Sequence, residues 1–274
     1  MSTVNANSNG SAGTGVAVVT GGARGFGREI ARRLVARGHR VVITDLDPDA
    51  VTRTAGELGA TAVVADARQA SEHRKVAAAA AELGPVTVWV NNAGVLRAGR
   101  AWEQPEADIA LMVEANFLGV VHGSRAAVDV MKARGGHLLN IASMSAHGPV
   151  PGLAVYAASK AAVLNFTTSL QGELDLARLP IRAHALCPDA ADTALVRGEQ
   201  ESPDTAILFS QRTLLTPATV ADAAMGLLGG RQVVRSLPTH RAGLMRTGAL
   251  LPRVALPVLA MLRARGDRRR IAGR

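Results

Sequence analysis

The sequence predicts an α/β fold in which about seven parallel strands form one doubly wound sheet with helices on both faces. Short apolar runs alternate with segments of helical periodicity along most of the chain, which is typical of parallel strands joined by helices. The first apolar run leads directly into a glycine-rich turn and then into an amphipathic segment. At 274 residues, the chain is long enough for one large domain with a substantial core.

Each element is expected from its local pattern. Residues 16–20 form a short apolar run, and Ile30, Ala31 and Leu34 then recur at helical spacing before Gly38, a typical C-terminal cap. By the same reasoning, strands are expected at 16–20, 40–45, 61–66, 86–91, 137–142, 181–187 and 232–236, of which the last has the weakest pattern. Helices are expected at 25–37, 48–58, 69–83, 105–133, 155–178, 203–212 and 217–229.

The turn after the first strand has the spacing G-x-x-x-G-x-G, formed by Gly21, Gly25 and Gly27. Glycines allow backbone amides to approach a pyrophosphate closely, and the N-terminus of the following helix stabilises its negative charge. A loop that only reverses the chain is the alternative, but the strand–turn–helix context favours nucleotide binding. The turn therefore predicts a dinucleotide site.

Asp45 ends the second expected strand, eighteen residues after Gly27. In dinucleotide-binding folds an acidic residue near this position accepts hydrogen bonds from the adenosine ribose, and its charge repels a 2′-phosphate. Asp47 and Asp49 add negative charge nearby, whereas Arg24 within the turn is placed to bind a 2′-phosphate. NAD is therefore the expected cofactor, and NADP is the less favoured alternative.

Tyr156 and Lys160 lie four residues apart in an alanine-rich segment, on one face of an expected helix. A free phenol ionises near pH ~10, and a neighbouring ammonium group favours its ionised form. The pair is therefore expected to exchange a proton with an alcohol or a ketone. A surface tyrosine stacked on a lysine stem is the alternative, because the spacing alone is common.

Together these motifs resemble the short-chain dehydrogenase/reductase family over about residues 15–230. Residues 20–27 are similar to its cofactor turn, and residues 91–94, Asn-Asn-Ala-Gly, to its N-N-A-G motif. Asp66, at the end of the third expected strand, is similar to the aspartate that contacts adenine. The resemblance implies a Rossmann fold that binds a nicotinamide cofactor.

The resemblance also implies a catalytic tetrad of Asn116, Ser143, Tyr156 and Lys160. Tyr156 would act as the general acid or base, and Lys160 would lower its pKa and hold the nicotinamide ribose. Ser143 would bind the substrate oxygen, while Asn116 would anchor a water in a proton relay. The implied cofactor contacts are Gly21, Arg24, Gly25, Phe26, Gly27, Asp45, Asp66, Asn92, Ala93, Gly94, Tyr156, Lys160, Pro188 and Thr193.

Two features depart from the family pattern. Asp189 follows Pro188 where members usually have glycine, and aspartate adopts a positive φ less readily than glycine. The segment after Gly229 and Gly230 also continues beyond the usual end of the family, so no oligomeric arrangement is carried over, although a homo-oligomer is expected. These departures keep open a catalytically silent sensor or scaffold that binds a dinucleotide.

The expected function is hydride transfer between the cofactor and a secondary alcohol or ketone, with an NADPH-dependent carbonyl reductase as a rival. The resemblance implies a substrate lid at 190–216. Apolar residues are expected to border the substrate: Leu96, Met144, Val150, Leu153, Ile207, Leu208 and Phe209. They favour a lipophilic substrate of a steroid-like, retinoid-like or long-chain kind, although ordinary core packing is the alternative.

Residues 1–14 are small and polar and are expected to be a disordered leader, followed by a catalytic domain at 15–240. Cys187 is the only cysteine and is expected in the core. The histidines show no metal-ligand spacing, so no metal is expected; His147 lies near the expected site. Without an apolar signal sequence, a cytoplasmic location is expected.

The C-terminal extension, 241–274, is basic and rich in leucine. Residues 231–274 hold eleven arginines and one aspartate, or +10, whereas the whole chain carries +9, so the catalytic domain is nearly neutral. Its uncharged run, 254–262, is too short to span a membrane. A tail packed on the domain or on a partner subunit is favoured, peripheral contact with anionic lipid is the second alternative, and nucleic-acid binding is not expected.

Overall fold

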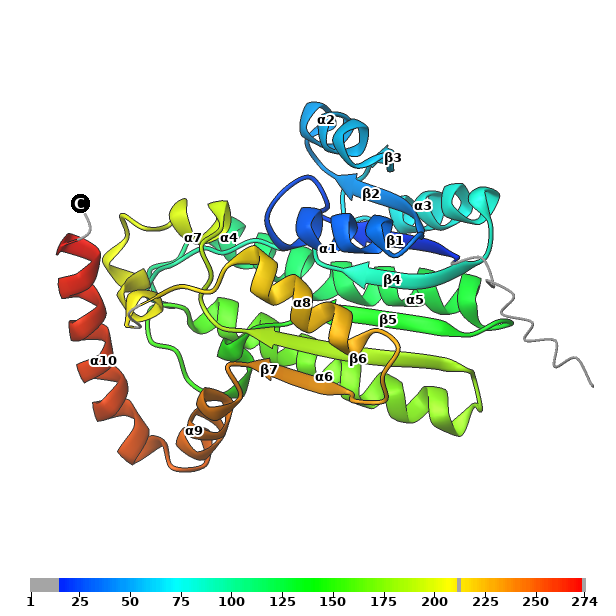
Figure 1. Ribbon diagram of the computed structural model, residues 1–274. Helices are drawn as coiled ribbons and strands as arrows, with labels where there is room; N and C mark the ends of the chain where they lie inside the picture. The colour runs from blue at the N-terminus through cyan, green and yellow to red at the C-terminus, as the bar shows by residue number, and fades with distance from the viewer. Residues whose placement is uncertain (1–14, 211–212, 273–274) are drawn as a thin grey trace, which may run out of the picture.

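The computed structural model describes residues 15–210 and 213–272, with side chains as far as Arg269. In this part of the chain, seven parallel strands form one sheet in the order β3-β2-β1-β4-β5-β6-β7, with helices on both faces (Figure 1). The strand order reverses between β1 and β4, and ligands of such sheets bind outside the carboxyl ends of the strands at this point. The predicted doubly wound fold is confirmed.

The strands lie close to their predicted positions. Val18 of β1 pairs with Val42 on one side and with Trp89 on the other, so β1 is central. The third strand ends two residues earlier than predicted, and the seventh lies slightly later. The strands are β1 (Val16–Thr20), β2 (Arg40–Asp45), β3 (Thr61–Val64), β4 (Val86–Asn91), β5 (Gly136–Ile141), β6 (Ile181–Pro188) and β7 (Val234–Leu237).

Two of the predicted helices differ in the structure, and the helices at Ala194–Arg197, Thr239–Leu250 and Pro252–Ala272 were not predicted. The predicted helix at 105–133 is divided by a π-helical segment, and the one predicted at 203–212 is a 3₁₀ segment that ends at Phe209, with residues 211–212 of that prediction outside the described residues. Up to Leu176, the helical elements are α1 (Gly25–Ala36), α2 (Pro48–Leu58), α3 (Ala70–Leu83), α4 (Glu106–Val113), the π-helical η1 (Glu114–Leu118), α5 (Gly119–Met131), the 3₁₀ η2 (Met144–His147) and α6 (Ala154–Leu176). The rest are α7 (Ala194–Arg197), η3 (Pro203–Phe209), α8 (Pro217–Leu227), α9 (Thr239–Leu250) and α10 (Pro252–Ala272).

The core lies on both faces of the sheet. Ala17 and Val19 of β1 face a cluster formed with α1 and α8, whereas Val16 and Val18 face a cluster formed with α3 and α5. Because both faces of a parallel strand are covered, its sequence is a continuous apolar run rather than an alternating one. This explains why the strand pattern was readable from the sequence.

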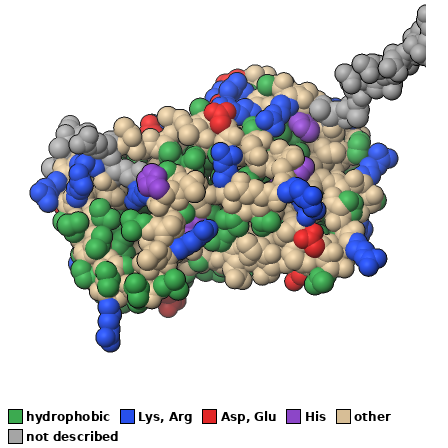
Figure 2. Space-filling model, turned by 60° about the horizontal axis from the view of Figure 1, so that its bottom comes forward, with side chains coloured by type: hydrophobic (Ala, Val, Ile, Leu, Met, Phe, Trp, Pro, Cys, Tyr) green, Lys and Arg blue, Asp and Glu red, His purple; other side chains and the backbone are tan. Residues whose placement is uncertain are grey.

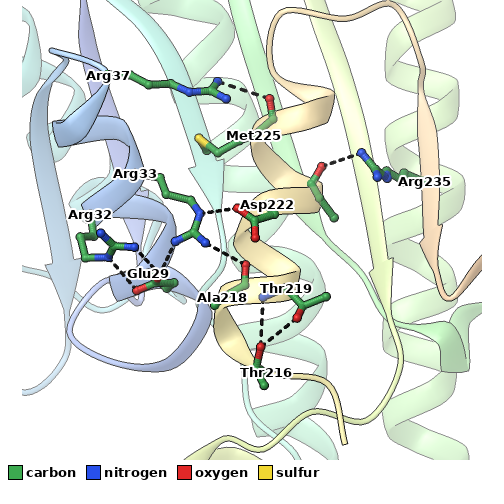
Figure 3. Close-up of polar contacts among 11 residues, drawn as sticks. Glu29, Arg32, Arg33, Arg37, Thr216, Ala218, Thr219, Asp222, Met225 and Arg235 are labelled. Atoms are coloured by element: carbon green, nitrogen blue, oxygen red, sulfur yellow. Dashed lines mark hydrogen bonds and ion pairs between the residues drawn. The ribbon is translucent and has the colours of Figure 1, made fainter.

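Polar contacts fix α1 against α8 (Figure 3). Arg33 of α1 pairs with Asp222 at 2.8 Å, donates to the Ala218 carbonyl at 3.2 Å, and also pairs with Glu29. The guanidinium groups of Arg32 and Arg33 hold the pKa of Glu29 below its ordinary value. These contacts orient α1, whose N-terminus carries the glycine turn.

The C-terminal extension packs on the catalytic domain as α9 and α10. In Figure 1, α9 follows β7 near the lower edge of the molecule, and α10 runs along the side that carries η3. No helix in the described ranges is both long and apolar enough to cross a membrane. The predicted leader, 1–14, lies outside the described residues.

Candidate active site

Ser143, Tyr156 and Lys160 meet at the carboxyl end of β5. Ser143 follows β5 and caps η2, accepting a hydrogen bond from the Ser145 amide at 3.2 Å. Tyr156 and Lys160 project from the first turns of α6, and both side chains are buried. The Lys160 Nζ lies 6.0 Å from the centroid of the Tyr156 ring. The structure therefore brings three members of the predicted tetrad together.

Lys160 is a buried cation with one described hydrogen bond, which its Nζ donates to the Ile141 carbonyl at 3.0 Å. Removing an ammonium group from water disfavours its charged form. Burial therefore lowers the pKa of Lys160 to about 8. At neutral pH the side chain is still mostly charged. It lines the cleft, where it is placed to bind a hydroxyl group.

The pKa of Tyr156 is shifted in the direction opposite to the sequence-based expectation. Burial raises the pKa of its phenol above the ordinary value, and a hydrogen bond with Ser143 partly opposes this rise. The lowering of this pKa that was expected from Lys160 is not found, because burial of the phenol is the largest influence on it. The phenol is therefore protonated at neutral pH and able to donate a proton.

Asn116 lies within η1, where its side chain is fully buried. Its Oδ1 accepts from the Val95 amide at 2.7 Å, and its Nδ2 donates to the Val95 carbonyl at 2.9 Å and to the Ser159 Oγ at 3.1 Å. Ser159 in turn donates to the Tyr156 carbonyl at 2.7 Å. Asn116 thus joins the loop that follows β4 to α6, the helix that carries Tyr156. The wider π-helical turn directs the Asn116 side chain into the interior.

Two serines were missed by the sequence analysis. The Ser145 Oγ lies 2.9 Å from the Ser143 Oγ, and Ser159 links Asn116 to α6. Ser145 lies two residues after Ser143, and Ser159 lies one residue before Lys160, but serines at such spacings are too common to be a signal. Only the positions of the side chains in the fold reveal them.

A cleft of about 570 Å³ runs from Ser143, Tyr156 and Lys160 to the glycine turn, and Asn116 does not line it. All predicted cofactor contacts line it except Gly27. A Cβ on Gly27 would overlap the Gly21 carbonyl oxygen, so this glycine is needed for close packing of the turn. Gly25 has φ +56 at the start of α1, and a Cβ there would contact the Thr193 side chain at 3.8 Å. This shape fits a pyrophosphate at the helix N-terminus.

The N-N-A-G segment holds the glycine turn in place. The Thr20 hydroxyl accepts from the amides of Asn92 and Ala93 at 3.0 and 3.1 Å. The Asn92 side chain donates to the carbonyls of Thr20 and Gly21 at 3.0 and 2.9 Å. These bonds join the ends of β1 and β4, so the Asn92 side chain supports the cleft rather than reaching across it.

Two carboxylates lie at the other end of the cleft. Asp45 accepts from the amides of Ala23 at 3.3 Å and Leu46 at 2.9 Å, which points its charge toward the turn. Asp66 pairs with Arg68 at 2.7 Å, and the hydrogen bonds from that guanidinium hold the pKa of Asp66 below its ordinary value. Asp45 therefore lies where a ribose is expected, and Arg24 lines the same cleft.

The family profile described as short chain dehydrogenase matches residues 15–204. The chain belongs to this family. It is 32% identical over 271 residues to the Probable oxidoreductase EphD of Mycobacterium tuberculosis, a match that covers 89% of this chain and 44% of that protein. The chain therefore spans less than half the length of this relative.

Two solved structures share the fold. A short chain dehydrogenase/reductase from Burkholderia phymatum, in complex with NAD, has a TM-score of 0.78 and 27% identity, with 85% of this chain and 92% of that chain covered. A variant of actinorhodin polyketide ketoreductase, with NADPH, has a TM-score of 0.72 and 32% identity, covering 78% and 90%. Proteins of this fold thus include one solved with NAD and one solved with NADPH.

The departure at Asp189 has a structural reason. Its Oδ2 lies 2.7 Å from the Nη1 of Arg241 in α9, and both side chains are largely buried. Arg178 is the only non-glycine residue with positive φ in the described ranges, so Asp189 does not need the backbone conformation that glycine provides. Arg241 was not among the predicted site residues, because a partner for Asp189 cannot be read from local sequence.

The remaining predicted neighbours of the site divide into two groups. His147 is buried and structural: its Nε2 lies 2.8 Å from the Ser236 Oγ, and its pKa is lowered by burial and by the charge of Arg246. Cys187 is a buried core residue, as predicted, and burial raises its pKa to about 11.

The apolar residues predicted to border the substrate are divided between the cleft and a second cavity beside it. Leu96 lines the cleft, and Leu208 lines both. The second cavity is lined by Met144, Val150 and Ile207, whereas neither is lined by Leu153 or Phe209.

Proposed function

We propose that the protein transfers a hydride between a nicotinamide cofactor and a secondary alcohol or ketone. The observation that carries this proposal is the burial of Ser143, Tyr156 and Lys160 at one end of a cleft whose other end is the glycine turn. When bound, the nicotinamide accepts or supplies the hydride. The chain's own residues bind the two reactants and move the proton.

In the direction of alcohol oxidation, the Tyr156 phenolate would accept the proton from the hydroxyl oxygen while the carbon that bears this oxygen gives its hydride to the nicotinamide. In reduction, the Tyr156 phenol donates a proton to the carbonyl oxygen. Ser143 hydrogen-bonds that oxygen, and Ser145 holds the Ser143 hydroxyl in position. Lys160 supplies positive charge beneath the cleft and is placed to bind the ribose. Asn116 holds the backbone of Val95 and α6 in register.

Alcohol oxidation is expected to accelerate with rising pH, whereas ketone reduction should stay nearly constant until Tyr156 ionises on the alkaline side. Oxidation needs ionised Tyr156, and burial raises the pKa of this phenol, so the reactive form increases on the alkaline side. Reduction needs the protonated phenol, which is abundant at neutral pH. Initial rates for one alcohol and its ketone, measured from pH 6 to pH 10, would test this. Parallel profiles in the two directions would contradict it.

The cofactor is proposed to be NAD. Asp45 places a carboxylate at the end of β2, and a 2′-phosphate within about 4 Å of it is disfavoured by roughly 1–4 kcal/mol. Asp45→Asn keeps the shape and removes the charge, so NADPH affinity should rise at least about tenfold with little change for NADH. Calorimetric titration with both cofactors measures this preference.

Asp49→Asn is the matched control, because Asp49 is a nearby exposed carboxylate on α2 that does not line the cleft. It should leave the preference unchanged. If wild-type protein instead bound NADPH more tightly, Arg24 would be the selecting residue and the chain would be a NADPH-dependent reductase. Binding of neither cofactor would contradict the proposed hydride transfer, since no hydride carrier would then occupy the cleft.

A further inference from the structure

A second cavity, of about 180 Å³, lies beside the cleft and is formed largely by the C-terminal extension. Its walls come from the segment around η2, from η3, and from α9 and α10. The side chains are mostly apolar and include Met144, Val150, Ile207, Met245, Val258 and Leu259. An apolar cavity of this kind suits a hydrocarbon ligand and disfavours ordered water.

The cavity adjoins the catalytic residues. Ser145, Asp189 and Leu208 line both the cavity and the cleft. Ser145 is hydrogen-bonded to Ser143, which is proposed to bind the reacting oxygen. Only the Ser145 side chain therefore lies between that oxygen and the end of the cavity that meets the cleft. A molecule held at Ser143 can therefore extend past Ser145 into the cavity.

Ionic and polar contacts hold the extension in place. Arg241 of α9 pairs with Asp189, Arg263 of α10 pairs with Asp204 at 2.5 Å, and Arg269 donates to the Ser210 carbonyl at 2.6 Å. Gly266 allows close contact, since a Cβ there would overlap the carbonyl oxygen of Ala206. Part of the excess basic charge thus anchors α9 and α10, which form a fixed wall of the cavity.

The cavity opens among exposed apolar side chains. Leu244, Leu251, Val254 and Val258 line it and are also 64%, 56%, 65% and 42% exposed. Figure 2 shows hydrophobic side chains gathered over the end of the molecule that carries α9 and α10. A lipophilic molecule can therefore meet an apolar surface at the opening as well as apolar walls inside.

We propose that this cavity binds the hydrocarbon chain of the substrate, which is a long-chain secondary alcohol or ketone. The inference rests on the proposed function, because that function places the alcohol or ketone group of the substrate at Ser143. The binding of the hydrocarbon chain is tested separately, by affinity alone. Each methylene that enters the cavity should tighten binding about fourfold until the cavity is filled. The extension is then a specificity element that selects substrates by chain length.

The test compares 2-butanone with 2-dodecanone in calorimetric titrations of the full-length protein, together with kcat/KM for the corresponding alcohols. Val258→Trp fills the cavity from α10, and Val254→Trp does so from a more exposed position, in case the first variant folds poorly. Leu256→Trp is the matched control, since Leu256 lies on the same helix with 47% exposure but does not line the cavity.

Wild-type protein and Leu256→Trp should bind 2-dodecanone at least about a hundredfold more tightly than 2-butanone. The two cavity variants should lose at least about tenfold in affinity for 2-dodecanone and little for 2-butanone. Equal affinity of the wild type for both ketones, or equal effects of all three substitutions, would overturn the proposal. Chain-length-dependent binding without turnover of any alcohol would support the cavity and refute the proposed reaction, so the two failures are distinguishable.

Discussion

Replacing Tyr156 with phenylalanine is expected to lower kcat/KM for alcohol oxidation by roughly 10²–10⁴-fold, the usual contribution of a positioned acid or base. The substitution removes only the hydroxyl group that exchanges the proton. The ring remains to fill its buried position beside Leu153 and Ala157. Initial rates of NADH formation under saturating cofactor measure the effect.

Cofactor binding provides the control for this variant. The glycine turn and Asp45 lie at the other end of the cleft, so Tyr156→Phe should change NADH affinity little and leave the thermal unfolding midpoint close to that of the wild type. A variant that retains wild-type turnover would show that Tyr156 is not the proton-exchanging group. Such a result would remove the proposed mechanism.

Replacing Lys160 with methionine should reduce turnover by at least about a hundredfold and yet stabilise the protein by about 2 kcal/mol at pH 7. The pKa of Lys160 falls from 10.5 to about 8 on folding, so the unfolded chain binds the proton more tightly. Below pH 8 the full penalty for burying the cation is present. Methionine removes this penalty but leaves the Ile141 carbonyl without its donor, which offsets about 1 kcal/mol.

The sign of the pH dependence gives a sharper test of the Lys160 prediction. Wild-type stability should rise relative to the variant between pH 8 and pH 10.5, because the unfolded state still holds its proton in this range while the folded state has lost it. Urea unfolding of both proteins at pH 7 and pH 10 measures the difference. A variant that is less stable by the same amount at both values would show that burial of the charge carries no penalty.

Most of the sheet was predictable because its strands are buried on both faces and its helices alternate with them. Val16–Thr20 is a continuous apolar run for this reason, and the polar residues at the strand ends mark the cleft. The π-helical segment Glu114–Leu118 was not predictable, because its sequence continues the helical pattern of its neighbours. Its effect is visible only in where Asn116 points.

The C-terminal extension was predicted in composition but not in structure. Pro252 and Pro257 interrupt its apolar pattern, and α10 depends on contacts with η3 that no local pattern reveals. The pair of Asp189 and Arg241 joins residues far apart in the chain, so the departure from the family pattern was noticed without its cause. The sequence also placed Lys160 beside Tyr156 but not the burial of both side chains, and burial decides the direction of their pKa shifts.

Tyr156 is the only tyrosine in the chain, so its ionisation can be followed directly by the near-ultraviolet absorbance of phenolate. The decisive measurement is this titration on protein saturated with NAD, compared with the pH dependence of kcat/KM for an alcohol at saturating NAD. If Tyr156 exchanges the proton, the two curves should share one midpoint, and Tyr156→Phe should lose both the absorbance change and the rate. Midpoints that differ by more than one pH unit would contradict the proposed role of Tyr156.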